Sequence, residues 1–293
     1  MRLFLFSILM LLSSFSSAET PVSLRGQDSR FVYPEDMIGK IHHGQYDFNT
    51  AGRGTHNGYV SVFNLPRKTV ESLLPNHLSL NNLDERFKDV YPVLVVWGEL
   101  TDCNGINFGI PFPSGIVYRE WQLYIPGVYR TNLDPKVLFT YVPRIFVDDA
   151  TAEYWGRRFF YKKILLDHLD FNISQGMKVE DWTSMKVQNR SPLSPWAGYA
   201  QKDDRWKSIL AYLPHSDILG ENGEGEEPRC SGFKWGDIDE SQVSEAQISM
   251  VWNKPFVEGM DESLIGKEIT SVATFEVRDW HFYVAYDYNY CRP

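Results

Sequence analysis

The run Tyr91-Pro-Val-Leu-Val-Val-Trp-Gly-Glu-Leu100 decides the fold class. It is almost continuously apolar and holds three valines, which is typical of a strand buried on both faces. A second run, Val117 to Val128, alternates as a strand does. Other strand-like segments are Gly58 to Phe63, part of Leu138 to Phe146, Arg157 to Phe171 (a strand or a hairpin arm), Gly176 to Trp182, Ser184 to Asn189 and Ile269 to Tyr288.

Helical signals are few. A short helix is predicted after Pro66, with Val70, Leu73 and Leu74 on one apolar face and Pro75 as its stop. Asp102 to Gly115 is rich in Asn, Gly and Pro and is predicted to be a long loop, and the glutamate-rich Gly220 to Pro228 an acidic surface loop. Asp203 to Leu213 fits a helix or a strand equally well. Many strands without a βαβ rhythm predict a mainly β, β-rich α+β fold with an antiparallel sheet.

The N-terminus predicts export. Residues 1–18 combine Arg2, the apolar run Leu3 to Leu12 and the small residues Ser16-Ser17-Ala18, which is the pattern of a signal peptide. The apolar run is too short to span a bilayer, which needs about 20 residues, and no later segment is apolar enough for a membrane helix. We therefore expect a secreted or periplasmic protein with an irregular lead-in at 19–55 and a single domain at 56–293.

Composition narrows the class of partner. The net charge of −9, without a basic cluster, disfavours nucleic acid as a partner, and 15% aromatic residues favour a packed core over disorder. Export also favours a disulfide among Cys103, Cys230 and Cys291, with three pairings open. Asn172-Ile173-Ser174 is a glycosylation sequon, which matters if the source is eukaryotic.

Several common catalytic motifs are missing from the sequence. It contains no Gly-x-Ser-x-Gly, no His-Glu-x-x-His and no paired Cys-x-x-Cys, so an α/β-hydrolase and the usual zinc sites are disfavoured. Asp167, His168 and Asp170 read as a solvated surface cluster. We predict neither a metal nor a cofactor.

The pair Lys162-Lys163 is the segment whose residues suggest a specific kind of catalysis. It stands between the apolar triplets Phe159-Phe160-Tyr161 and Ile164-Leu165-Leu166. A lysine amine attacks a ketone only when it is unprotonated, and apolar surroundings or a nearby cation favour that state. Neighbours on a strand point to opposite faces, so only one of the two can enter a pocket. The alternative is a solvated pair on a strand edge, where lysine is common.

Five stretches in order along the chain resemble the acetoacetate decarboxylase family. Val70 to Leu80 is similar to the family's helix followed by Leu-Leu-Pro-x-x-Leu, and Tyr118 to Pro126 to its strand with an aromatic residue, a glutamate and a terminal Ile-Pro. Tyr141 to Asp149, followed by Gly156-Arg157, resembles its Tyr…Asp…Gly-Arg stretch. Lys267-Glu-Ile and Tyr286-Asp-Tyr288 match the family's end. The chain is thus suspected to be a divergent, secreted member.

The resemblance implies a sheet-rich domain with a closed or nearly closed barrel. It implies that Lys162 is the Schiff-base lysine, with Lys163 as its neighbour and Glu120 as the proton-handling residue, for which Glu99 is a second candidate. It also implies substrate-side roles, and the residues expected there are Arg157, His56, Glu99 and Tyr118.

One departure leaves alternatives open. The lysines stand two places earlier than in the family and the preceding proline is absent, so an ungapped alignment puts Ile164 and Leu165 at the lysine positions. An offset of two preserves the facing of a strand, so the site can survive the shift.

The leading functional prediction is a lysine Schiff-base enzyme, a decarboxylase or related aldol-type lyase acting on a small keto acid. The alternative is a catalytically inactive protein that binds a small apolar ligand on the same fold. A third interpretation, a sugar-binding or glycosidase-like β protein, is suggested by nine tryptophans. Assembly into a homo-oligomer stays open.

Overall fold

The computed structural model describes residues 52–81, 87–104, 106–107, 110–111, 115–132, 134–158, 161–190, 217–220, 229–236 and 240–284. In these ranges strands dominate, and the helices are short. The helices are α2 (Arg67–Glu71), α3 (Ala150–Arg158) and the 3-10 turns η4 (Glu240–Gln242) and η5 (Glu262–Leu264). The β-rich fold class predicted from sequence is confirmed.

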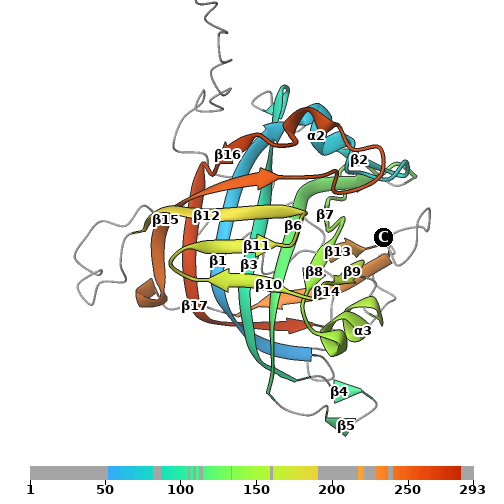
Figure 1. Cartoon of the computed structure of the whole chain (residues 1–293). Coiled ribbons are helices and arrows are strands. Elements are labelled where there is room, and N and C mark those ends of the chain that lie inside the picture. The colour runs from blue at the N-terminus through green and yellow to red at the C-terminus, as the bar shows by residue number, and fades with distance from the viewer. Residues whose placement is uncertain are drawn as a thin grey trace, which may run out of the picture.

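In the part of the chain that the structure describes, fifteen strands form one curled sheet, and two more form a separate pair (Figure 1). The sheet comprises β1 (Gly52–Pro66), β2 (Leu78–Leu80), β3 (Val90–Asn104), β6 (Ile116–Arg130), β7 (Phe139–Tyr141), β8 (Ile145–Val147), β9 (Lys163–Leu165), β10 (Leu169–Asn172), β11 (Gly176–Val179), β12 (Thr183–Arg190), β13 (Asp217–Gly220), β14 (Arg229–Trp235), β15 (Val243–Trp252), β16 (Glu268–Thr270) and β17 (Ala273–Val284). The separate pair is β4 (Ile106–Asn107) and β5 (Ile110–Pro111).

The long strands are antiparallel neighbours in the order β17, β1, β3 and β6. From β6 the pairing continues through β7, β13 and β14 back to β17, so the hydrogen-bonded path closes on itself. From β17 a second path leads through β15 to β12, β11 and β10, which lie across β1 and β3 (Figure 1).

The two faces of the long strands have different roles because side chains alternate along a strand. One face carries Trp97 and Trp121 and packs on the layer of β10 to β12, with the Trp97 and Phe171 ring centroids 6.0 Å apart. We call it the Trp97 face. The opposite face carries Leu100 and Glu120, and we call it the Glu120 face. Every residue from Tyr91 to Trp97 is buried, as the apolar run predicted for a strand covered on both sides.

The structure corrects three sequence-based boundaries. β1 begins at Gly52 rather than Gly58, because its polar first residues still pair with both β3 and β17. The loop predicted from Asp102 is wrong at its start, since β3 continues to Asn104 through a bulge. Arg157 was expected in a strand but lies in the last turn of α3, a helix that begins where Asp149 accepts a hydrogen bond from the Ala152 amide at 2.8 Å.

Other expectations agree with the structure where it describes them. α2 follows Pro66, and the strands predicted over 176–182 and 184–189 are β11 and β12. The predicted long C-terminal strand is β16 followed by β17. The signal peptide, nearly all of the lead-in, the segment 203–213 and residues 221–228 of the acidic loop lie outside the described residues.

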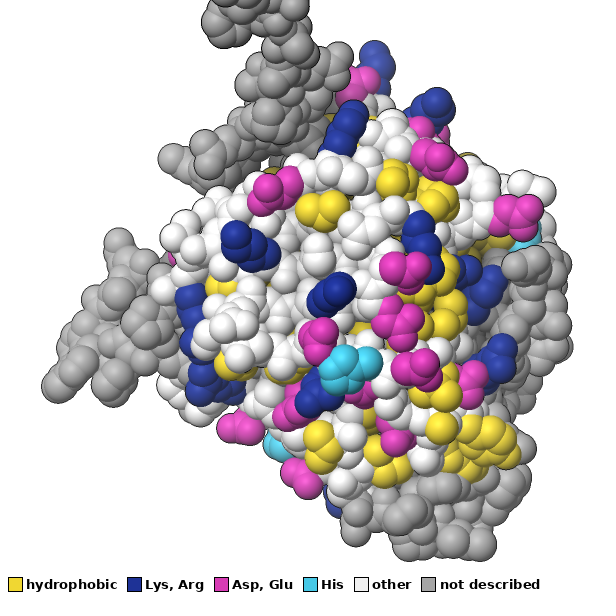
Figure 2. All heavy atoms as spheres, in the orientation of Figure 1, with side chains coloured by type: hydrophobic (Ala, Val, Ile, Leu, Met, Phe, Trp, Pro, Cys, Tyr) yellow, Lys and Arg dark blue, Asp and Glu magenta, His cyan; other side chains and the backbone are white. Residues whose placement is uncertain are grey.

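The surface carries charges of both signs. Figure 2 shows acidic and basic side chains intermixed over the face that holds β10 to β12. His168 and Asp170 form an exposed pair with 2.6 Å between Nε2 and Oδ1, as expected of a surface cluster. Within the described ranges, none of the helices has the length and apolar character needed to cross a membrane.

The cysteine and sequon predictions are only partly covered. Cys103 is a free thiol, so the two pairings that involve it are not formed. The Cys230 to Cys291 pairing lies outside the described side chains and stays a prediction. Asn172 is exposed in the turn between β10 and β11, where Ser174 N donates to its Oδ1 at 2.9 Å.

Candidate functional site

A buried ion pair joins Lys163 and Glu120 on the Glu120 face. The Lys163 Nζ donates to Glu120 Oε2, and the two side chains are 9% and 4% exposed. The Nζ atom also lies 5.3 Å from the centre of the Tyr118 ring. Removing two charges from water is unfavourable unless they are well paired, so a buried lysine–carboxylate pair marks a place where chemistry is a stronger explanation than stability.

Local structure brings Lys163 to this position. After α3 the chain turns, with Tyr161 N donating to Gly156 O at 3.1 Å, and then enters β9 parallel to β8. Ile145 stands between Lys163 and Gln122 in register, so both side chains lie on the Glu120 face. Gly156 leaves space for the lysine stem, because a Cβ there would stand 2.2 Å from Lys163 Cδ.

A chain of hydrogen bonds orients the carboxylate. Gln122 Nε2 donates to Glu120 Oε1, and the Tyr124 hydroxyl donates to Gln122 Oε1. The tyrosine therefore fixes which end of the amide faces Glu120, and the amide fixes the carboxylate. All of these groups are buried, so water does not compete for them.

Burial raises the pKa of Glu120, and the attraction and hydrogen bond of Lys163 oppose that rise. The pKa of Tyr118 is raised well above its usual value, first by burial and then by the Glu120 charge, so the ring stays a neutral phenol. Cys103 lies against Tyr118, and burial raises the pKa of its thiol to about 12. Neither side chain adds a charge beside the lysine.

Two glycines lie next to Glu120. Gly58 and Gly98 stand in register with it, and their strands approach so closely that a Cβ on either glycine would strike the opposite backbone. His56 lies beyond them on the same face, 1% exposed, with neither ring nitrogen hydrogen-bonded to a described residue and its ring packed edge-on against Trp235, 5.7 Å between centroids. Burial lowers the pKa of His56 to about 3, so it is a neutral donor and acceptor.

The structure places the remaining predicted site residues elsewhere. Lys162 precedes β9 and is half-buried, so the expectation that it turns inward is corrected by strand alternation in favour of Lys163. Arg157 is exposed on α3 and pairs with Glu153 at 3.1 Å. Glu99 lies on the Trp97 face, 4.0 Å from Arg119.

Sequence reasoning missed Gln122 and Tyr124. The signal was present, because Tyr118, Glu120, Gln122 and Tyr124 alternate along one strand and so share a face. A row of polar side chains inside an otherwise apolar strand indicates a buried network.

Comparisons with known proteins give distant structural likenesses. No protein-family model and no curated protein matches the chain. Among solved structures, it is similar to the enduracididine biosynthesis enzyme MppR complexed with pyruvate, at 9% identity and a TM-score of 0.48, over 81% of this chain and 88% of that one.

Two further structures bear the family name suggested by the motifs. One is an acetoacetate decarboxylase-like enzyme from Sphingomonas wittichii RW1, at 11% identity and a TM-score of 0.45, over 81% of this chain and 91% of that one. The other is an acetoacetate decarboxylase, at 13% identity and a TM-score of 0.42, over 86% of this chain and 96% of that one. At such identities the likeness concerns the fold alone.

Proposed function

We propose that this chain is a carbon–carbon lyase that forms a Schiff base between Lys163 and a small keto acid. The observation that carries the proposal is the buried contact of Lys163 with Glu120. The reaction is a decarboxylation or a related aldol-type cleavage.

The pair supplies the neutral amine that the reaction needs. Transfer of one proton from the Lys163 ammonium to the Glu120 carboxylate leaves two neutral groups, and the burial that raises the Glu120 pKa favours this state. The lysine then attacks the ketone carbon, and protonated Glu120 gives its proton to the departing hydroxyl, which leaves as water.

The iminium then acts as the electron acceptor. The bond to the carboxylate breaks, carbon dioxide leaves, and the electron pair moves to the iminium nitrogen to give an enamine. Glu120, reprotonated from water, protonates the enamine carbon. Water hydrolyses the new iminium, which releases the ketone and restores the lysine. The net change is keto acid anion plus one proton to ketone plus carbon dioxide.

Neighbouring groups have positioning roles. Gln122 and Tyr124 hold the carboxylate, and the Tyr118 ring stabilises cationic charge on the Lys163 nitrogen through its face. His56, whose ring nitrogens have no hydrogen bond to a described residue, offers a neutral hydrogen bond to the substrate.

The test is ketone release from a panel of β-keto acids, in which the carboxylate stands on the carbon next to the ketone. Lys163→Ala should lower the rate at least about 10³-fold because it removes the nucleophile. Lys162→Ala, the matched control, should keep the rate within about threefold, since a half-exposed charge acts weakly at a distance. Equal losses in both variants would contradict the assignment. Binding of keto acids without turnover would favour the ligand-binding alternative.

We also propose that the enzyme works outside the cytoplasm, on the strength of the leader-like residues 1–18. N-terminal sequencing of the mature protein should begin after Ala18. If the source is eukaryotic, glycosidase treatment should remove a glycan from Asn172, whose side chain is exposed. An intact Met1 would contradict export.

A further inference from the structure

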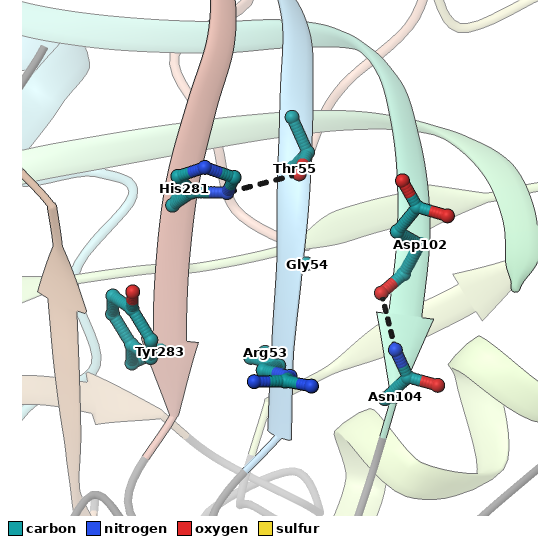
Figure 3. Close-up of a pocket in the computed structure, with 7 residues that line it drawn as sticks. All are labelled: Arg53, Gly54, Thr55, Asp102, Asn104, His281 and Tyr283. Carbon is teal, nitrogen blue, oxygen red and sulfur yellow. Dashed lines mark hydrogen bonds between the residues drawn. The ribbon is translucent and has the colours of Figure 1, made fainter. Parts of the chain in front are cut away.

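A pocket lies at the end of β1, β3 and β17, with a volume of about 320 Å³. Figure 3 shows Arg53 and Thr55 on the middle strand, between one pair of residues on β3 and another on β17. The lining is polar, and it consists of Arg53, Gly54, Thr55, Asp102, Asn104, His281 and Tyr283.

This pocket is separate from the lysine site. A Cβ on Gly54 would point at Cys103 Sγ, 2.7 Å away, and so toward the Glu120 face. Arg53 and Thr55 alternate with Gly54 and point the other way. The pocket therefore opens on the opposite side of the sheet from Lys163.

Two opposite charges line the pocket without neutralising each other. Arg53 is exposed and has no hydrogen bond or ion pair with any residue that the structure describes. The carboxylate of Asp102 likewise has no hydrogen bond or ion pair with any residue that the structure describes. The backbone oxygen of Asp102 accepts a hydrogen bond from Asn104 Nδ2 at 2.8 Å. In Figure 3 the Asp102 carboxylate points away from the end where Arg53 lies. A guanidinium and a carboxylate are thus held apart across one small cavity.

The backbone is shaped to place Asp102 there. A bulge interrupts the pairing of β3 with both neighbouring strands. In the pairing with β1 the register shifts between Arg53 and Thr55, and in the pairing with β6 it shifts between Leu100 and Cys103. Asp102 has a φ of 51°, a left-handed conformation that non-glycine residues rarely adopt. Bulges re-aim side chains, and here Asp102 joins Asn104 on the pocket side while Cys103 turns inward.

We infer that this pocket binds a free α-amino acid as a zwitterion. The ligand carboxylate pairs with Arg53, between Tyr283 and Asn104, which flank it in register. The ligand ammonium pairs with Asp102. His281, whose Nδ1 is hydrogen-bonded to the Thr55 hydroxyl at 3.1 Å, leaves its second ring nitrogen for the ligand. The volume is at the lower end of small-molecule sites and suits a molecule of this size.

Titration calorimetry of the whole protein tests the inference, with L-alanine, propionate and propylamine as probes. L-alanine should bind at least about tenfold more tightly than propionate or propylamine, because each analogue leaves one charge unpaired. Arg53→Gln and Asp102→Asn should each weaken L-alanine binding by about tenfold or more. Asparagine tolerates the left-handed backbone at position 102, so the second variant tests charge and not folding.

Matched controls come from an exposed ion pair elsewhere, Lys254 with Asp181, whose Nζ and Oδ1 are 2.7 Å apart. Lys254→Gln and Asp181→Asn remove the same charges from the protein and should bind L-alanine like the wild type. No heat from L-alanine at millimolar concentration would overturn the inference. Propionate binding as tightly as L-alanine, unaffected by Asp102→Asn, would also overturn it and show an anion site.

Discussion

Two glutamates are buried in the sheet, and their partners differ in kind. Glu120 is 3% exposed and Glu276 is fully buried. Glu276 lies on β17 and accepts bonds from two arginines: Arg190 Nη2 at 2.5 Å and Arg278 Nε at 2.9 Å. Arginine keeps its charge under all ordinary conditions, so this carboxylate is permanently paired. Glu120 is paired with a lysine, which can give up its proton.

The difference in partners suits a structural role for Glu276 and the reactive role proposed for Glu120. Arg190 joins β12 to β17, and Tyr59 on the Trp97 face also reaches Glu276, at 3.4 Å. The cluster thus ties the outer layer to the central strands with charges that do not change. On the Glu120 face the partners are a lysine and the neutral amide of Gln122. We therefore propose a structural role for Glu276 and a role in proton transfer for Glu120.

The largest effect on stability is expected at Glu276. Arg190→Met removes the bidentate partner of a fully buried carboxylate and should lower the free energy of unfolding by about 3 to 5 kcal/mol. Urea unfolding measures the loss. Arg157→Met, which removes an exposed arginine paired with Glu153, should lower it by about 1 kcal/mol or less and serves as control. Equal losses would contradict a structural role for the cluster.

The opposite result is expected at Glu120. The double change Lys163→Met with Glu120→Gln removes both charges together, so the free energy of unfolding should stay within about 1 kcal/mol or rise by as much as about 4 kcal/mol. Keto acid turnover should be lost in the same protein. A drop of about 3 kcal/mol or more would show that this pair, too, is kept for stability.

His56 predicts a dependence on acid. Its pKa falls from about 6.5 in the unfolded chain to about 3 in the fold, so the unfolded state binds one more proton between these values. Stability is complete above pH 6.5 and should fall by about 1.4 kcal/mol for each pH unit below it. In His56→Phe this part of the slope should vanish in urea titrations between pH 6.5 and 4. An unchanged slope would show that His56 is not held neutral.

The smallest effect is expected in the hydrogen-bond chain from Tyr124 through Gln122 to Glu120. Tyr124→Phe removes the hydroxyl that donates a hydrogen bond to Gln122 Oε1, and it should lower the free energy of unfolding by about 1 kcal/mol. If the hydroxyl also positions Glu120, kcat should fall while KM stays constant. A change in stability with kcat intact would limit Tyr124 to a structural role.

Much of the fold could be read from the sequence, because burial leaves a periodic trace. Tyr91 to Leu100 predicted its strand, and Pro66 predicted the start of α2. The helix α3 was missed because Gly156 and the aromatic residues after it weaken the helical pattern, while Asp149 as its cap reads like any loop residue. The start of β1 at Gly52 was missed because its first residues are polar and show no apolar alternation, although their backbone pairs with both β17 and β3.

The candidate site was predictable in its parts and not in its register. The sequence indicated that only one lysine of the pair can enter a pocket, and the family resemblance implied Glu120 as a proton-handling residue. Which lysine turns inward depends on where β9 begins after α3, and a shift of one residue exchanges the two. The burial of His56 without a hydrogen bond and the pocket around Arg53 depend on contacts between distant strands, and no local pattern encodes them.

Borohydride trapping tests the central claim most directly. The native protein is mixed with a panel of keto acids, reduced, digested and read by peptide mass spectrometry. A Schiff base reduced in place should appear on Lys163 alone, and the adduct should be absent from Lys163→Ala and present in Lys162→Ala. An adduct on Lys162, or no adduct on either lysine of the folded protein, would contradict the account.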